Sequence, residues 1–350
     1  MLPSAPTAPI APPELSITVS PPDTFAFPTF PIAPNEKMSF VVNIVGDYWA
    51  NSENRSNIEL GKHRHRKLFL SNAALGLDLE DGYGQFENEH GSERLEGILA
   101  FIIKTARPGV PLKEMLRAEF VCRRGLLRNL SINNNCHTFI TFHAIRHRGI
   151  IFLCEDKNIG DAPDKLRRAM YYNLKFENVV TTPQARSVTA QKREETKTVI
   201  HATIEKAGAE PIRVYYAAEI DCLDQAGEGV ELKTISKPLE SGWDKSRSMA
   251  WYMQCFFGNV KKIVVGQRQR NRLRAFRFVD VASIRQNNCH NWTVDACLDQ
   301  LHTTLAFVKQ YMTMDGMSLK FTTIHGCTYV ATSALGQYIV PENFLREFPF

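Results

Sequence analysis

The sequence lacks the features that mark several common classes of protein. No stretch reaches the roughly 18 consecutive apolar residues of a membrane-spanning helix, and the first residues show no basic segment followed by an apolar one. The eight cysteines are scattered and form no Cys-x-x-Cys pair, which argues against a zinc ribbon or a redox dithiol. We therefore expect no membrane partner, reduced and mostly buried cysteines, and a location in the nucleus or the cytoplasm.

Several catalytic and nucleotide-binding motifs are also missing. There is no nucleophile elbow with a Ser-His-Asp group, no glycine-rich phosphate loop and no dinucleotide-binding fingerprint. His137, His143 and His147 lie near Cys136, but their spacing matches no zinc pattern. These absences argue against a covalent hydrolase, a P-loop NTPase and a Rossmann-type enzyme.

Positive charge is only slightly in excess, with 42 Lys and Arg against 37 Asp and Glu, for a net charge of +5. Proteins that clamp long duplexes usually carry a larger basic excess. The basic residues gather in two runs, at residues 62–67 and 268–274, as on a surface that follows phosphates, although solvated faces explain them equally well. The net charge alone is therefore too slight to indicate a polyanionic partner.

The chain divides into a proline-rich start and a long region with the composition of a globular protein. Ten of the 18 prolines lie before residue 35, so residues 1–37 are predicted to be a disordered tail. Residues 38–350 are predicted to form one domain. Within it, residues 181–209 are rich in Thr, Lys, Glu and Gln, which predicts a surface insertion or a polar helix.

Strands and helices alternate along this region. Short runs of β-branched and aromatic residues predict strands at residues 138–145, 149–155, 213–222, 229–235 and 262–266. Apolar residues spaced three and four apart predict helices at residues 94–103, 163–180, 245–257 and 293–314. The alternation predicts an α/β or α+β fold, with mixed β-sheets flanked by helices.

The strongest chemical signal is a group of charged residues on two predicted strands. Glu219 and Asp221 are two apart on one strand, so they point to one face, and the same holds for Glu231 and Lys233 on the next. Residues 223–229 suit a hairpin that would bring the two faces together. Carboxylates packed this closely repel unless a divalent cation joins them, and their hard oxygens favour Mg²⁺ or Mn²⁺ over zinc.

This spacing resembles the acidic-x-acidic and Glu-x-Lys arrangement of restriction-endonuclease-like nucleases, the PD-(D/E)xK type. In those enzymes metal ions activate a water molecule, and the lysine orients it or stabilises charge beside the phosphorus. A solvated strand face with alternating charge explains the spacing equally well. Support therefore has to come from other parts of the chain.

Further motifs occur in the order found in the DXO/Dom-3 family of RNA decapping and exoribonuclease enzymes. Residues 77–83 resemble its Leu-Asp-Leu-x-Asp-Gly-Tyr stretch, residues 149–155 its Gly-x-aromatic-Leu-x-Glu strand, and residues 173–177 its Gly-Tyr-Lys-Phe-Glu motif. The other matching segments are Arg124-Gly125, residues 219–222, residues 230–234, and Trp251 with Gln254 ahead of residues 263–266. The resemblance is specific because these motifs recur in one order.

The resemblance implies a restriction-endonuclease-like core and a role for each matching residue. The implied ligands of two Mg²⁺ or Mn²⁺ ions are Glu177, Glu219, Asp221, Glu231 and the backbone carbonyl of Leu232. Glu219 and Lys233 are the implied catalytic residues. The implied contacts to the scissile phosphate are made by Arg124, Lys233 and Gln254.

The resemblance also implies the substrate, which is the 5′ end of single-stranded RNA. Members of the family remove 5′ pyrophosphate, incomplete caps or nicotinamide-adenine caps, and some then degrade the RNA from its 5′ end. The implied function is RNA 5′-end quality control by metal-dependent hydrolysis. Two alternatives stay open: a catalytically weak partner that stabilises a 5′–3′ exoribonuclease, and a nuclease that acts on DNA.

Some of the matching residues have simpler explanations, and one departs from the family. Glu177 fits the solvated face of an amphipathic helix, Arg124 a basic helical face, and Gln254 a buried amide that satisfies a backbone group. Asn173 stands where the family motif has glycine. A close backbone approach or a positive φ at this position would therefore be lost.

Overall fold

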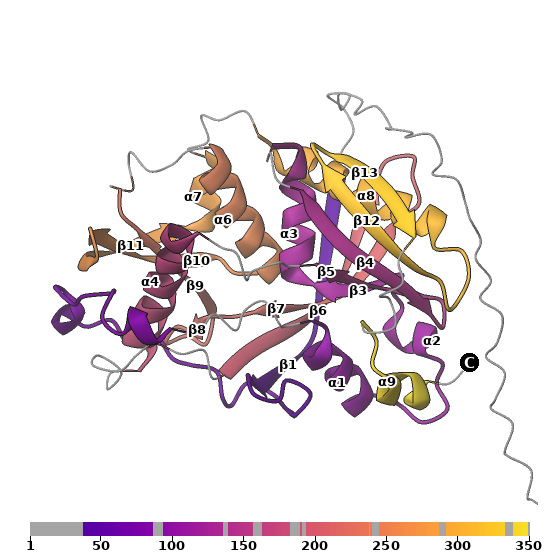
Figure 1. The fold of residues 1–350 in the computed structure, drawn as a ribbon, viewed down its shortest axis with the longest axis horizontal. Coiled ribbons are helices and arrows are strands. Elements are labelled where there is room, and N and C mark those ends of the chain that lie inside the picture. Colours follow the sequence, from indigo (N-terminus) through magenta and orange to yellow (C-terminus); the bar gives the residue numbers. More distant parts are fainter. Residues whose placement is uncertain are drawn as a thin grey trace, which may run out of the picture.

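The computed structural model describes residues 38–86, 94–135, 139–156, 163–182, 190, 194–237, 239, 245–286, 292–332 and 339–348. The predicted proline-rich tail lies outside these residues, and Met38 begins the first strand. Two β-sheets and the helices on their faces make up the fold (Figure 1). The predicted mixed α/β architecture is confirmed.

The larger sheet has nine strands, and its edges are β13 and β2. In spatial order the strands are β13 (Cys327–Thr332), β12 (Ser318–Ile324), β4 (Ile140–His147), β5 (Ile150–Glu155), β3 (Phe120–Arg123), β7 (Ile212–Glu219), β6 (Glu194–Lys206), β1 (Met38–Asn51) and β2 (Ile58–Leu60). β3 runs parallel to both β5 and β7, and the other neighbours are antiparallel.

The smaller sheet has four strands, in the order β11 (Arg272–Asp280), β10 (Lys262–Gln269), β9 (Gly229–Ile235) and β8 (Cys222–Leu223). β9 and β10 are parallel, as the intervening helix α6 (Lys245–Gly258) requires, and the other pairs are antiparallel. The chain passes from the larger sheet to the smaller one between β7 and β8 (Figure 1).

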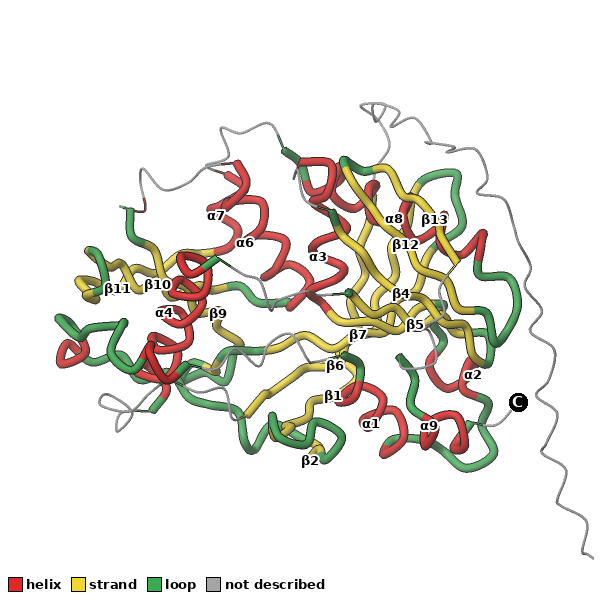
Figure 2. The backbone as a smooth tube through the Cα atoms, in the orientation of Figure 1, coloured by secondary structure: helices red, strands yellow, loops and turns green. Residues whose placement is uncertain are grey.

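Helices cover both sheets, and Figure 2 shows them in red around the yellow strands. One face of the larger sheet packs against α3 (Arg124–Ile132), α8 (Val294–Tyr311) and α6. The opposite face packs against α1 (Glu96–Lys104), α2 (Leu112–Leu116) and α9 (Glu342–Glu347). The remaining helices are α4 (Asp164–Thr181), α7 (Val281–Gln286) and the 3₁₀ turns Asn72–Ala74, Tyr83–Gln85 and Asn133–Asn135.

Alternating side chains place the smaller sheet between two helices. Leu232 and Val264 pack in a cluster with Phe176 of α4, whereas Ile263 and Val265 pack in the cluster that contains α6. That second cluster also contains side chains of the larger sheet, so the two sheets share a core. None of the described helices is long and apolar enough to cross a membrane.

Most of the predicted elements are confirmed, with small shifts of their ends. The predicted helices correspond to α1, α4, α6 and α8, and four of the five predicted strands correspond to β4, β5, β9 and β10. The fifth, residues 213–222, is not one strand, because the chain leaves β7 after Glu219 and begins β8 at Cys222.

The prediction for residues 181–209 is wrong where the structure describes it. Residues Glu194–Lys206 form β6, which lies inside the larger sheet between β7 and β1. Val199 and Ile200 are fully buried, and Lys197 pairs at 2.7 Å with the equally buried Glu195. The segment is rich in Thr, which suits a strand, and its charged side chains neutralise each other, so its polar composition misled the prediction.

Candidate active site

The junction between the two sheets holds the first pair of predicted carboxylates. Glu219 ends β7, opposite Lys197 of β6, and Asp221 follows in the short link to β8. The Leu232 N–H donates to Asp221 Oδ2 at 2.7 Å, which fixes the Asp221 carboxylate against β9. Asp221 is 6% exposed, so its carboxylate is almost completely removed from water.

The second pair lies on β9, which is joined to β8 by the predicted hairpin. Leu223 pairs with Gly229 across this hairpin, and Glu231 and Lys233 then point to the same side of β9 as their register partners Ile263 and Val265 on β10. This is the side that α6 covers. Because Ile263 and Val265 are buried, β9 presents its charged residues inward, and the solvated-face explanation is wrong for them.

Donors from three elements converge on the buried Glu231 carboxylate. Lys233 Nζ of the same strand and Gln254 Nε2 of α6 both donate to Glu231 Oε1, and Arg124 Nη1 of α3 donates to Oε2 at 3.3 Å. Arg124 Nη1 also donates to the Glu219 backbone carbonyl at 3.1 Å. The Arg124 side chain is 11% exposed, so it is not part of a solvated basic face.

The pKa values of Asp221 and Glu231 are shifted in opposite directions. Burial, and then the charges of Glu231 and Glu177, raise the pKa of Asp221 well above its ordinary value. Burial also acts to raise the pKa of Glu231, but Lys233 and Arg124 outweigh it and hold that pKa below its usual value. Glu231 is therefore neutralised by its basic neighbours, whereas at Asp221 the charge of Lys233 does not offset burial and the acidic neighbours.

Lys233 and Glu219 each lie beside a group of opposite charge. Burial acts to lower the pKa of Lys233, but Glu231 and Asp221 outweigh it and raise that pKa, so this side chain is a cation at neutral pH. Burial lowers the pKa of Lys197 to about 8, and the nearby Glu219 opposes this shift. The site thus alternates acidic and basic groups across β6, β7 and β9.

Glu177 reaches the site from α4, which packs against β9. Asn173, one turn earlier on the helix, donates from Nδ2 to Glu177 Oε1 at 2.6 Å, so Glu177 is not a freely solvated residue. Asn173 lies inside α4, and it is not among the described residues with positive φ. The expected loss of a positive φ therefore does not apply, because this position is helical.

The donor set fits a hard divalent cation, although the side chains are not yet gathered around one point. Among the described residues, no three His, Cys, Asp or Glu side chains already form a metal-ligand group. Glu231 accepts hydrogen bonds from three donors, and Glu177 accepts one from Asn173. A cation beside Asp221 would supply the positive charge that this buried carboxylate lacks, and oxygen is the ligand atom that Mg²⁺ and Mn²⁺ prefer.

One contributor to this network was missed by the sequence reasoning. Arg128 donates from Nη1 to Gln254 Oε1 at 3.0 Å, so Gln254 bridges Arg128 and Glu231. Gln254 thus bonds side chains of the site rather than a backbone group. The four-residue spacing of Arg124 and Arg128, with Leu127 buried between them, was the available signal.

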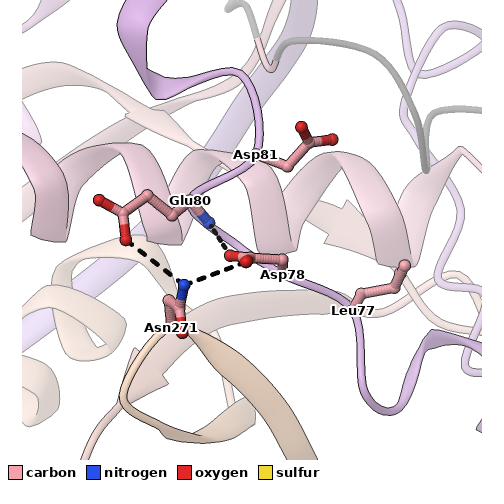
Figure 3. A pocket seen from close by; sticks show the side chains of 5 residues that line it. All are labelled: Leu77, Asp78, Glu80, Asp81 and Asn271. Atoms are coloured by element: carbon pink, nitrogen blue, oxygen red, sulfur yellow. Dashed lines mark hydrogen bonds between the residues drawn. The ribbon is translucent and has the colours of Figure 1, made fainter.

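The motif at residues 77–83 supports the site from outside it. Its carboxylates line a cavity of about 440 Å³ together with Leu77 and Asn271 (Figure 3). Asn271 Nδ2 donates to Asp78 Oδ2 at 3.1 Å and to Glu80 Oε2 at 3.4 Å, and Tyr172 of α4 donates to Glu80 at 3.1 Å. The motif therefore joins α4 to the β10–β11 hairpin, and its acidic lining does not suit a phosphate.

The two basic runs lie in different places. Residues 62–67 pass beside β8, where the Leu223 N–H donates to the Arg66 carbonyl at 2.8 Å and Arg66 Nη1 donates to Asn178 at 3.3 Å. Arg66 of this run therefore contacts α4 at the residue that follows Glu177. The second run forms the turn between β10 and β11, and the Arg268 guanidinium stacks 4.7 Å from the Tyr172 ring centre.

His143 and His147 each contact a polar group elsewhere in the chain. His143 pairs with Asp156 at 3.4 Å, and His147 Nε2 lies 2.7 Å from the Phe348 carbonyl. His137 and Cys136 lie outside the described residues. All of the described cysteines except Cys327 are buried.

The chain is similar to known proteins both in sequence and in fold. A sequence model of the family described as RAI1-like PD-(D/E)XK nuclease matches residues 33–345. The decapping nuclease dom-3 of Caenorhabditis elegans is 28% identical over 335 residues, which cover 87% of this chain and 84% of that protein.

Two solved Rai1 structures superimpose on most of the chain. Rai1 of Scheffersomyces stipitis, in complex with (3′-NADP)+ and calcium ion, has a TM-score of 0.69 at 15% identity and covers 88% of this chain and 95% of its own. Rai1 of Candida albicans, in complex with pU5-Mn2+, has a TM-score of 0.66 at 17% identity, with 89% and 96% covered. The order of the motifs, the fold and the family match agree: the chain belongs to the RAI1-like PD-(D/E)XK nuclease family and is a hydrolase.

Proposed function

We propose that this chain is a divalent-metal-dependent hydrolase that cleaves phosphate bonds at the 5′ end of single-stranded RNA. The observation that carries the proposal is the junction of the two sheets, where Asp221 is buried without sufficient positive charge. Glu231 is held beside it by Arg124, Lys233 and Gln254. Buried acidity beside several cationic and amide donors suits metal ions and a phosphate together.

The relatives favour the same chemistry. The C. elegans relative is named a decapping nuclease, and a Rai1 relative was solved with a 5′-phosphorylated oligouridine and Mn²⁺. Removal of caps, of 5′ pyrophosphate or of nicotinamide-adenine caps, and digestion that continues from the 5′ end, are the activities we propose to test. The modest net charge of +5 is in keeping with an end-binding site.

The proposed ligands are oxygen atoms from three elements: Glu177 of α4, Glu219 and Asp221 at the end of β7, and Glu231 with the Leu232 carbonyl on β9. When bound, the cations would act as Lewis acids toward the phosphate and the attacking water. To hold a cation, Glu231 would have to turn from its present donors toward Asp221, while Glu177 would keep its contact with Asn173. The change at Glu231 is a side-chain rotation.

Lys233, Arg124 and Gln254 are proposed to hold the scissile phosphate. Because its neighbours raise its pKa, Lys233 stays protonated at neutral pH and donates hydrogen bonds, rather than accepting a proton as a base. Arg124 presents a planar guanidinium to the same region, and Gln254 an amide N–H. If Glu231 turned toward a cation, all three donors would be released to the phosphate oxygens.

The experiment incubates the purified chain with RNAs that carry a 5′-triphosphate, a 5′-monophosphate, a methylated or unmethylated cap, or a nicotinamide-adenine cap. Mg²⁺, Mn²⁺ or EDTA is added, and the products are separated. The matched variants are Glu231→Ala and Glu228→Ala, since Glu228 is an exposed carboxylate three residues earlier in the same hairpin. A DNA strand of the same sequence measures the preference for RNA.

We expect metal-dependent release of a product from the 5′ end by the wild type and Glu228→Ala, and none by Glu231→Ala. The end that is cleaved fastest identifies the substrate. If wild type and Glu231→Ala give the same products under every condition, the catalytic proposal is wrong. The chain would then have to act through a partner, such as a 5′–3′ exoribonuclease.

A further inference from the structure

We propose that Asn173 is a positioning residue that fixes two of the proposed metal ligands, the Glu177 carboxylate and the Leu232 carbonyl. This inference rests on the proposed function, because it assumes that these oxygen atoms bind a cation. The matching position of the DXO/Dom-3 motif is glycine, which has no side chain. The arrangement is therefore a property of this chain's own sequence.

The Asn173 side chain uses both ends of its amide between α4 and β9. Its Nδ2 donates to Glu177 Oε1 at 2.6 Å and lies 3.5 Å from the Leu232 carbonyl oxygen. Its Oδ1 accepts from the Thr234 N–H at 3.0 Å. One side chain thus connects the helix that carries Glu177 to the strand that carries Leu232.

The contact to Glu177 is the strongest of the three. Residues four apart on a helix lie on one face, so Asn173 and Glu177 meet without distortion of α4. A hydrogen bond to a carboxylate is charge-assisted, and its length of 2.6 Å is slightly shorter than the usual range. It restrains the Glu177 rotamer in the absence of any cation.

The same contacts are compatible with metal binding. A carboxylate has two oxygen atoms, of which Asn173 Nδ2 contacts Oε1 of Glu177, and a carbonyl oxygen such as that of Leu232 has two lone pairs. Groups that orient metal ligands in this way typically contribute about 10- to 100-fold in metal affinity. We therefore expect Asn173 to strengthen metal binding although it is not itself a ligand.

The test measures Mn²⁺ binding by the full chain without RNA, from the electron paramagnetic resonance signal of free Mn²⁺. The variants are Asn173→Gly, which introduces the family residue, and Asn173→Ala, which removes the amide without weakening the helix. The matched control is Ala169→Gly, an exposed position one turn earlier in α4. It carries the same cost of a helical glycine, about 1 kcal/mol, away from the site.

We expect Asn173→Gly and Asn173→Ala to bind Mn²⁺ about 10-fold more weakly than the wild type, or worse, and Ala169→Gly to bind like the wild type. Equal affinity in the wild type and both Asn173 variants would overturn the inference. So would an equal loss in Asn173→Gly and Ala169→Gly with none in Asn173→Ala, because helix stability would then be the cause. If the wild type binds no Mn²⁺, it is the proposed function that fails.

Discussion

Two acidic clusters of this molecule contrast in how their charge is balanced. In the cavity of Figure 3, Asp78 accepts from the Glu80 N–H at 2.8 Å and from Asn271, and Glu80 pairs with Arg168 and Tyr172. At the junction of the sheets, Asp221 is buried, and burial and its acidic neighbours raise its pKa. Both clusters are rich in acidic residues. Only the junction contains a buried carboxylate whose charge its neighbours do not balance.

The contrast has a structural cause. The cavity cluster comes from a loop that can arrange its own hydrogen bonds, since Asp78 and Glu80 are two residues apart and Asn271 faces them from a hairpin. The junction cluster is imposed by the fold, because β7, β9 and α4 bring carboxylates together from distant parts of the chain. The contrast supports the proposal that the metal site lies at the junction and that the cavity cluster has a supporting role.

The largest expected effect is the loss of RNA 5′-end hydrolysis when a carboxylate of the junction cluster, and not one of the cavity cluster, is replaced. Asp221→Asn keeps the shape of the side chain and removes its charge, and we expect RNA 5′-end hydrolysis to fall by roughly 10³-fold or more, equivalent to several kcal/mol. The matched substitution Asp78→Asn should leave the rate within about twofold, a change of well under 1 kcal/mol. Single-turnover rates measure both, and a comparable loss in the two variants would abolish the distinction between the clusters.

A smaller effect is expected on stability as a function of pH in the absence of metal. Because the pKa of Asp221 is raised in the folded chain, protonation stabilises the fold. This contribution is complete below the ordinary pKa of Asp, about 4, and it is lost as the pH rises through the raised value. Asp221→Asn should therefore become progressively more stable than the wild type as pH increases.

Urea unfolding in EDTA at a series of pH values measures this difference. Asp78→Asn is measured alongside as the control from the cavity cluster. Added Mn²⁺ should stabilise the wild type and not Asp221→Asn, by about 2.7 kcal/mol at a concentration 100 times the Kd. A constant difference in unfolding free energy between Asp221→Asn and the wild type at every pH would mean that folding does not raise the pKa of Asp221.

The part of the site that could be predicted from sequence is the part built on regular strands. The period of two placed Glu231 and Lys233 on one face of β9, and the composition of residues 223–229 indicated the hairpin. The same rule singled out Asp221, although Asp221 does not lie on a regular strand. It lies in the link between sheets, and no local pattern shows that a chain changes sheets there.

Other features could not be predicted because they depend on tertiary contacts. The buried pair of Lys197 and Glu195 makes β6 look like a polar surface segment, although its Thr, Val and Ile residues are typical of a strand. Asn173 looked like the loss of a glycine, whereas its side chain makes contacts that only the packing of α4 on β9 creates. In both cases the deciding partner is distant in sequence.

The location of the metal is tested most directly by anomalous scattering from Mn²⁺ in crystals of the wild-type chain. The account predicts a Mn²⁺ peak within bonding distance of Asp221, Glu231 and Glu177 oxygen atoms, and no comparable peak in the cavity of Figure 3. A peak held by Asp78, Glu80 and Asp81, with none at the junction of the two sheets, would contradict it.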